Sequence, residues 1–208
     1  MNACYLIQLG TSVSHLTGDL SKVAMDAVEG HSRISRAALN LIFAAVGFVL
    51  GAATAGYFIH HPTIEFSRPY GRAVIAIGVC LAAAHFSLAP APVLSVSLAG
   101  FACGFQNALA THYRGMVLRT THVTGLLTDL GTNLGMMLKG HQIARWKLLV
   151  PTLLVMSFFA GAVFGSTLVI ALSRPALLIL ACMYIGGGIG WSIYKHVFLT
   201  AGERENPV

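Results

Sequence analysis

Charged side chains are scarce in this chain of 208 residues, which has 13 Lys and Arg and 7 Asp and Glu. They make up 10% of the residues, whereas about 25% is usual in soluble domains. Hydrophobic residues make up 56%, and the mean hydropathy is +0.74. This balance excludes a water-soluble enzyme with its own packed core. It predicts an integral membrane protein in contact with the lipid bilayer.

The sequence also has few of the motifs that soluble functions need. The formal net charge of +6 could indicate a nucleic-acid partner, but Lys and Arg lie in short connections between apolar runs, where they orient a protein in a membrane. The four cysteines are far apart and form no CxxC or Cys/His spacing of a zinc site. No Gly-x-Ser-x-Gly motif occurs. We therefore expect no nucleic-acid partner, no metal and no cofactor.

Long apolar runs predict an all-α fold, a polytopic bundle of transmembrane helices. One crossing needs roughly 20 apolar residues. The sequence Ala89-Pro90-Ala91-Pro92 divides the uncharged run 73–113 into two helices, because proline breaks a helix interior. Complete spans are predicted at 39–59, 73–89, 93–110, 148–172 and 175–194. An incomplete first span would bring the total to about six.

Pairs of glycines four residues apart recur inside these runs. Such small-xxx-small patterns let two helix backbones approach closely. The main interpretation is packing between helices of one chain, and a homo-oligomer formed through one of the patterns is the alternative. The pairs are Gly47/Gly51, Gly100/Gly104, Gly161/Gly165 and Gly186/Gly190.

The chain matches itself after an offset of 107 residues. Residues 14–20 (SHLTGDL) correspond to residues 121–127 (THVTGLL), and an Asn-Ala pair precedes each motif. The match predicts two repeated halves, 1–90 and 91–208, within one integral membrane domain. In this alignment Met1 falls inside the element that 93–110 shows complete, so we expect the first half to be N-terminally incomplete.

The doubled motif resembles a known family. Residues 104–108 (GFQNA), residues 119–125 (RTTHVTG) with Thr128-Asp129, and residues 14–18 (SHLTG) are similar to the YoaK-like family of uncharacterised bacterial inner-membrane proteins. The resemblance extends over nearly the whole chain. It implies a multi-spanning protein of the cell's inner (plasma) membrane and supplies no reaction. Asp19 stands where the family often has Asn.

The segment after each motif is too polar for a lipid-facing span, yet its polar residues share one helical face. That face holds His15, Asp19, Lys22 and Asp26 in the first copy, and His122, Leu126, Asp129 and Asn133 in the second. A helix that begins at Thr-Gly points unpaired N–H groups and its positive dipole end at whatever precedes it. The sequence thus predicts two short His-x-Thr-Gly half-helices that meet near a central site, as in repeat-built transporters.

The leading functional hypothesis is a transporter or channel for a small polar or anionic solute, and not an enzyme. The alternatives are a structural or regulatory membrane protein whose polar faces bind partner helices, and a membrane-embedded enzyme that uses His122 and Asp129 as acid and base. A metal site built from His15, His122 and Asp129 is a minor alternative. The candidate substrate-binding residues are His15, Thr17, Gly18, Asp19, Asn107, Arg119, Thr121, His122, Thr124, Gly125, Asp129 and Asn133.

A simpler interpretation of the same motif is purely local. A Thr before a helix is often only an N-cap, a His near a membrane surface is often interfacial, and the charges after the first motif could form a solvated face. Asp129 is the exception, because an ionisable group in an apolar segment is expensive and by default functional. We therefore expect Asp129 to be the most functionally sensitive carboxylate.

The distribution of Lys and Arg predicts the orientation. If both half-helices are re-entrant, the halves are inverted, and nine Lys and Arg fall on the side of the C-terminus against four on the other. If both helices cross fully, the split is about seven to six. The positive-inside rule favours the inverted arrangement, with the C-terminus in the cytoplasm.

Overall fold

The computed structural model describes residues 1–29, 34–58, 70–109, 112–113, 116–117, 120–172 and 175–199. Almost all of these residues are helical, and the described strands are two antiparallel segments of two residues each. The elements are α1 (Asn2–Leu9), α2 (Leu16–Glu29), α3 (Ile34–Phe58), α4 (Tyr70–Ser87), α5 (Pro92–Leu109), β1 (His112–Tyr113), β2 (Met116–Val117), α6 (Val123–Leu138), α7 (Trp146–Ser166), η1 (Thr167–Ala171), α8 (Ala176–Tyr194) and η2 (Lys195–Leu199).

Five helices of the described chain are long and apolar enough to cross a membrane. Each begins and ends within three residues of a span predicted from the sequence, so the helical membrane fold is confirmed. Neither α2 nor α6 is among the five. The candidate spans are Ala37–Phe58, Tyr70–Ser87, Pro92–Leu109, Trp146–Ala171 and Ala176–Val197.

Proline and glycine mark several of the helix boundaries. Pro92 is the first residue of α5, a position where the missing N–H of proline costs nothing, and Pro175 is the N-cap of α8. Gly10 ends α1 with φ 68°, a left-handed conformation that glycine adopts without strain. Its N–H donates to the carbonyl of Leu6. These stops give α1 and α2 a defined loop between them.

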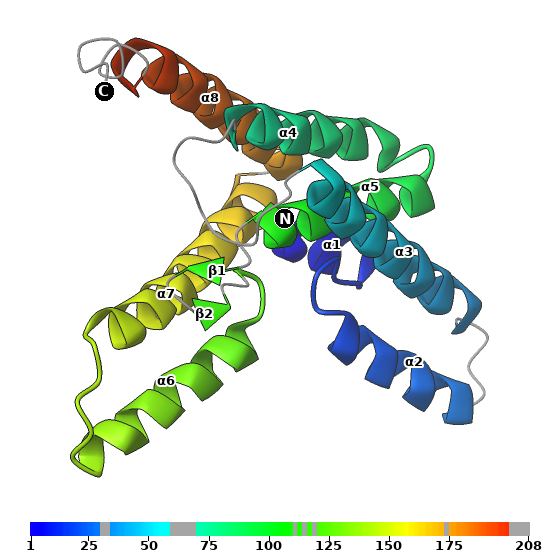
Figure 1. The fold of residues 1–208 in the computed structure, drawn as a ribbon. Coiled ribbons are helices and arrows are strands. Elements are labelled where there is room, and N and C mark those ends of the chain that lie inside the picture. The colour runs from blue at the N-terminus through cyan, green and yellow to red at the C-terminus, as the bar shows by residue number, and fades with distance from the viewer. Residues whose placement is uncertain are drawn as a thin grey trace.

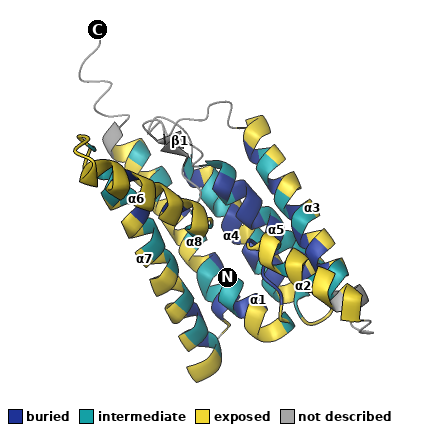
Figure 2. Ribbon diagram, turned by 90° about the horizontal axis from the view of Figure 1, so that it is seen from below, coloured by how far each residue is buried: buried dark blue, intermediate teal, exposed yellow. Residues whose placement is uncertain are grey.

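The core of the bundle lies along α5, which has nine buried residues, whereas α7 has two (Figure 2). Helix α3 packs along α5 through facing glycines. A Cβ on Gly100 would lie 2.5 Å from the carbonyl oxygen of Ala44, and one on Gly104 would collide with the carbonyl of Phe48. Gly47 and Gly51 face the α5 backbone in the same way. The predicted packing between helices of one chain is thus confirmed for these two glycine pairs.

The other two glycine pairs have more room. A Cβ on Gly161, Gly186 or Gly190 would meet no described atom within 4 Å, and one on Gly165 would meet only the Cβ of Ala3, at 3.9 Å. Helix α8 instead uses Gly188 against α4. The small-residue face of α7 is therefore open within the described chain.

Large apolar side chains cover the outer surface of the spans. Val49 on α3 and Phe159 on α7 are each 64% exposed, and Phe86 on α4 is 68% exposed. An apolar surface of this extent is unfavourable in water and favourable in hydrocarbon. The outer surface therefore contacts the lipid bilayer.

The elements of 1–90 and 91–208 follow each other in the same order. Residues 1–90 contain α1, α2, α3 and α4, and residues 91–208 contain α5, α6, α7 and α8, with β1 and β2 between α5 and α6. Figure 1 shows the α2–α3 pair and the α6–α7 pair spread to opposite sides of α1 and α5. This arrangement agrees with two halves, and the repeat itself stays a prediction.

Candidate functional site

The first motif is held by Asn2 of α1. Its Oδ1 accepts a hydrogen bond from the backbone N–H of Val13 at 3.2 Å. Its Nδ2 donates to Oγ of Ser14 at 2.6 Å and to Nδ1 of His15 at 3.1 Å. The Asn2 amide thus forms hydrogen bonds to the backbone of Val13, to the hydroxyl of Ser14 and to the imidazole of His15. These bonds fix the loop just before α2 begins at Leu16.

Asp19, in the first turn of α2, closes the other side of the same loop. One carboxylate oxygen, Oδ2, accepts from Oγ1 of Thr11 at 3.1 Å, from the backbone N–H of Ser12 at 2.8 Å and from Oγ of Ser12 at 3.0 Å. Oγ of Ser12 in turn accepts from the backbone N–H of His15 at 3.2 Å. An acidic side chain near a helix N-terminus is also favoured by the helix dipole. Asp19 therefore stabilises the conformation of the loop before α2.

The second motif is attached to the end of α5. Asn107 is buried, its Nδ2 donates to the carbonyl of Cys103 at 2.9 Å, and its Oδ1 accepts from Oγ1 of Thr121 at 3.2 Å. Helix α6 begins two residues later, with His122 as its N-cap. Both halves thus join an asparagine to the hydroxyl residue that precedes the motif histidine.

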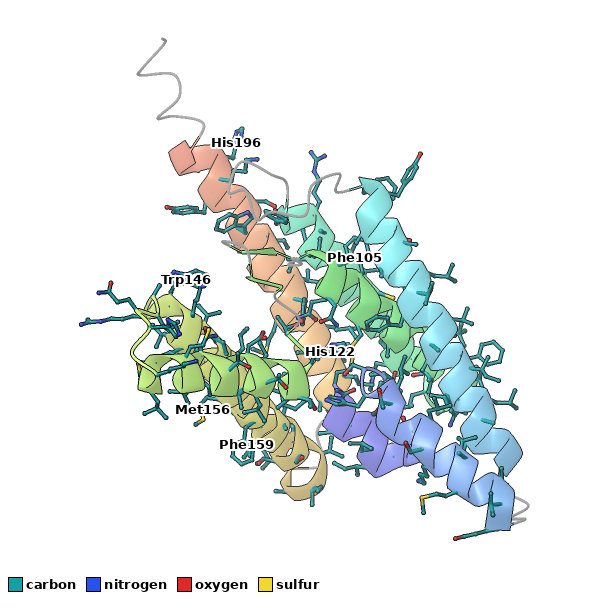
Figure 3. The ribbon with its side chains drawn as sticks, turned by 60° about the horizontal axis from the view of Figure 1, so that its bottom comes forward. Phe105, His122, Trp146, Met156, Phe159 and His196 are labelled. Atoms are coloured by element: carbon teal, nitrogen blue, oxygen red, sulfur yellow. The ribbon has the colours of Figure 1, made fainter. Side chains whose placement is uncertain are left out.

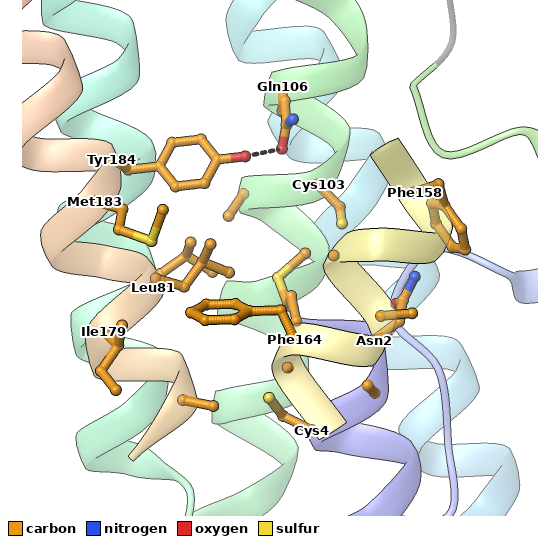
Figure 4. Close-up of a pocket in the computed structure, with 18 of the residues that line it drawn as sticks. Asn2, Cys4, Leu81, Cys103, Gln106, Phe158, Phe164, Ile179, Met183 and Tyr184 are labelled. Atoms are coloured by element: carbon orange, nitrogen blue, oxygen red, sulfur yellow. Dashed lines mark hydrogen bonds between the residues drawn. The ribbon is translucent and has the colours of Figure 1, made fainter. Parts of the chain in front are cut away.

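A cavity of about 310 Å³ is lined by residues from both 1–90 and 91–208 (Figure 4). Its wall comes from α1, α4, α5, α7, η1, α8 and the residue before the second motif histidine. Asn2 and Thr121, one from each asparagine–hydroxyl pair, both lie on this wall. The half-helices α2 and α6 themselves lie apart (Figures 1 and 2) and contribute no described residue to the wall, so the predicted meeting of the two helices at a central site is not seen. The polar side chains on the wall are Asn2, Gln106, Thr121, Ser157 and Tyr184.

A polar contact between two residues of the cavity wall joins α8 to α5. The hydroxyl of Tyr184 donates to Oε1 of Gln106 at 2.7 Å, which Figure 4 shows as a dashed line. Oε1 is thus engaged, and Nε2 of Gln106 has no hydrogen-bond partner among the described residues. The rest of the wall is mostly apolar, and Phe158 and Phe164 supply its rings.

The two motif histidines occupy different surroundings. The ring of His15 packs edge-on against Phe158 of α7, with centroids 5.4 Å apart, so the first motif touches the second half. His122 is exposed and lies at the inner end of α6, and Trp146 lies at the far end of the α6–α7 pair (Figure 3). His15 therefore borders the cavity through Phe158 and Asn2.

Most of the other candidate residues lie along α2 and α6, away from the cavity wall. Thr17, Gly18, Thr124 and Gly125 are exposed in the first turns of their helices, which confirms the predicted helix starts. A Cβ on Gly18 would meet no described atom within 4 Å, and one on Gly125 only the Cβ of His122, at 4.0 Å. Neither motif glycine makes a close helix contact within the described chain.

Asp129 and Asn133 lie one turn apart on α6. Asp129 is exposed, and Asn133 is buried and donates from Nδ2 to the backbone carbonyl of Asp129 at 2.7 Å. Arg119 lies outside the described residues. Within the described chain, no three His, Cys, Asp or Glu side chains are close enough to share a metal ion.

Four polar wall residues, Asn2, Gln106, Ser157 and Tyr184, were not among the sequence candidates. Asn2 had a signal, because Asn2-Ala3 stands before the first motif as Asn107-Ala108 stands before the second. Gln106 belongs to the GFQNA segment that carries the family resemblance. Nothing in the sequence pointed to Tyr184 as a wall residue, because its hydrogen-bond partner Gln106 is 78 positions away in the chain.

The five spans and the lipid-facing surface define a polytopic helical membrane protein. The sequence profile of DUF1275, described as a protein of unknown function, matches residues 1–191, and the chain belongs to this family. It is similar to a curated UPF0700 transmembrane protein of Rhizobium meliloti (strain 1021), with 33% identity over 169 residues, which are 81% of this chain and 69% of the relative. No solved structure matches the chain. The resemblance to an uncharacterised bacterial membrane family is thereby confirmed.

Proposed function

We propose that this membrane protein is a small-solute transporter or channel and that the cavity lined by both of its halves is the solute site. The observation that carries the proposal is the convergence of the two asparagine–hydroxyl pairs, through Asn2 and Thr121, on one cavity wall. Transporters built from repeats place their substrate site between the repeats, beside interrupted or short helices.

The candidate residues have different roles in this proposal. Asn107, Thr121 and His15 hold the cavity wall, because each is bonded to a wall residue or is one. The motif residues of α2 and α6, which are Thr17, Gly18, Asp19, His122, Thr124, Gly125, Asp129 and Asn133, belong to the helices that would move or line a path to the cavity.

The wall favours a neutral solute over an anionic one. No Asp, Glu, Lys, Arg or His side chain is among the residues that line the cavity. An unpaired ion in such surroundings loses its hydration without compensation. The expectation of an anionic solute depended on Arg119, which lies outside the described residues, and on the N-termini of α2 and α6, which do not line the cavity.

We also propose a bacterial inner (plasma) membrane location with the C-terminus in the cytoplasm. The support is the family resemblance and the excess of Lys and Arg on that side in the inverted arrangement. Alkaline phosphatase and green fluorescent protein fused after Val208 would report the side directly. We expect fluorescence and no phosphatase activity, and the reverse result would overturn the orientation.

The transport proposal is tested by reconstituting the full chain in liposomes and recording solute-driven swelling with a series of neutral and charged small solutes. We expect faster swelling than in protein-free liposomes for at least one solute, and slower swelling with Asn107→Ala. Thr128→Val is the matched control, because Thr128 bonds only within α6, to the carbonyl of Thr124 at 2.9 Å. No uptake of any solute would favour a structural or regulatory protein.

A further inference from the structure

We infer that the cavity binds neutral, mainly apolar molecules that carry one hydrogen-bond acceptor, of about the size of a substituted benzene ring. The inference rests on the proposed function in taking the same cavity as the site. It concerns binding, however, and is tested separately from transport.

The first observation is that no side chain on the wall is of a charged type. Of the 22 residues that line the cavity, 17 are apolar or glycine, and none of the other five carries an ionisable acid or base of the Asp, Glu, Lys, Arg or His type. A carboxylate or ammonium ligand would lose its hydration and would meet no side chain of opposite charge on the wall. A neutral ligand avoids that cost and gains from burying its apolar surface.

The polar groups on the wall determine what the ligand must offer. Asn2 is engaged at both ends of its amide, with Val13 at Oδ1 and with Ser14 and His15 at Nδ2. The hydroxyl of Thr121 already donates its hydrogen bond to Oδ1 of Asn107. Gln106 differs, because Tyr184 engages only its Oε1.

Nε2 of Gln106 is therefore a donor on the cavity wall without a hydrogen-bond partner among the described residues, and the hydroxyl of Ser157 is a second one. The hydrogen bond from Tyr184 fixes the amide plane, since the tyrosine hydroxyl donates to Oε1 at 2.7 Å. An amide NH₂ donates two hydrogen bonds and accepts none, so its complement on a ligand is a carbonyl, ether or hydroxyl oxygen. Figure 4 shows this pair at one end of a cavity whose middle is apolar. A ligand with one acceptor at one end and an apolar body fits this order of groups.

The shape agrees with a compact ring. About 310 Å³ is at the small end of ligand pockets, which range over roughly 300–1,000 Å³. Gly161 and Gly165 leave the α7 wall without side chains, and Phe158 and Phe164 stand beside that gap. A flat ring could lie over the glycines against these two aromatic side chains.

The test uses the full chain in lipid nanodiscs and three probes of equal size that differ in charge: benzamide, benzoate and benzylammonium. Binding is measured by saturation-transfer NMR and by the shift of the thermal midpoint. We expect benzamide to bind at least tenfold more tightly than either ion. Equal or tighter binding of either ion would overturn the assignment to neutral ligands.

Two glycine variants locate the binding. Gly161→Leu adds a side chain that projects into the cavity, and Gly186→Leu adds the same side chain to α8 at a position that does not line it; at both positions a Cβ meets no described atom within 4 Å. We expect Gly161→Leu to weaken benzamide binding at least tenfold and Gly186→Leu to leave it unchanged. Equal effects of the two variants, or none, would place the binding elsewhere. No binding to the unaltered protein, as when a lipid chain or another helix fills the cavity, would also overturn the inference.

Gln106→Leu tests the donor. The variant should weaken the binding of benzamide severalfold. It should leave the binding of toluene, which has no hydrogen-bond acceptor, unchanged. An equal loss for both probes would mean that Gln106 acts through packing and not as a donor, and would overturn this part. Benzamide binding without uptake of any solute would leave this inference standing and refute transport. Transport of an ion unaffected by Gly161→Leu would do the opposite.

Discussion

The amide nitrogen of Asn2 donates a hydrogen bond to the hydroxyl of Ser14 at 2.6 Å, 12 positions away in the chain. Its counterpart in the second half joins Asn107 and Thr121 at 3.2 Å, although there the hydroxyl is the donor. In each half the contact ties the first helix to the residue just before the motif histidine. The start of each short helix is thereby fixed relative to α1 or α5, the helices that line the cavity.

Removing the hydroxyl of Thr121 should therefore loosen the second motif. Thr121→Val keeps the shape of the side chain and leaves Oδ1 of buried Asn107 without its donor, at a cost of about 1 to 3 kcal/mol. We expect a lower thermal midpoint in nanodiscs. Thr128→Val, which removes only a bond within α6, should change the midpoint little. The same midpoint for both variants would show that the Asn107 contact contributes nothing.

Two glycines of α3 give a matched test of the α3–α5 contact. Gly51→Ala puts a Cβ against the carbonyl of Phe101, whereas a Cβ on Gly56 meets no described atom within 4 Å. Gly51→Ala should destabilise by about 1–3 kcal/mol through overpacking. Gly56→Ala should be neutral or stabilise by up to about 1 kcal/mol through helix propensity. The yield of monodisperse protein and its thermal midpoint would check both, and equal tolerance would count against this contact.

Asp19 should behave as a stability residue. Asp19→Ala removes the acceptor of three hydrogen bonds from Thr11 and Ser12, so the loop before α2 should loosen and stability should fall by about 1–3 kcal/mol. Lys22→Ala is the control, because exposed Lys22 makes one long contact, to the carbonyl of Gly10 at 3.5 Å. Hydrogen exchange of the amides of 11–15 would localise the effect. Unchanged protection in Asp19→Ala would contradict this role.

The spans could be predicted because a bilayer imposes a length and excludes charge, and both are visible in one sequence. The prolines at Pro92 and Pro175 then fixed helix starts to within a residue or two. Facing glycines were also visible, but their partners were not. The pairing of Gly104 with Phe48 depends on which helices meet, and a single sequence does not show that.

The candidate site was predicted less completely, for a related reason. The motif residues were visible as a repeat, yet the groups on the cavity wall come from helices far apart in the chain, as in the pair Tyr184 and Gln106. The half-helices that begin at the motifs were expected to meet near a central site, and Gly18 has no described neighbour within 4 Å of its Cβ position. The repeated sequence motif thus predicted where the two short helices begin, but it did not predict which residues they contact in the folded protein.

Asp129 gives the sharpest contrast with Asp19. It is exposed on α6, and Asn133 bonds to its backbone carbonyl and leaves the carboxylate without a described partner. Asp129→Asn keeps the shape and removes the charge, so we expect an unchanged thermal midpoint, because no described contact depends on that charge. In reconstituted liposomes we expect a slower uptake, because Asp129 lies on α6, which we propose moves with or lines the path to the cavity. An Asp129→Asn protein with the original uptake rate would show that this carboxylate has no part in transport.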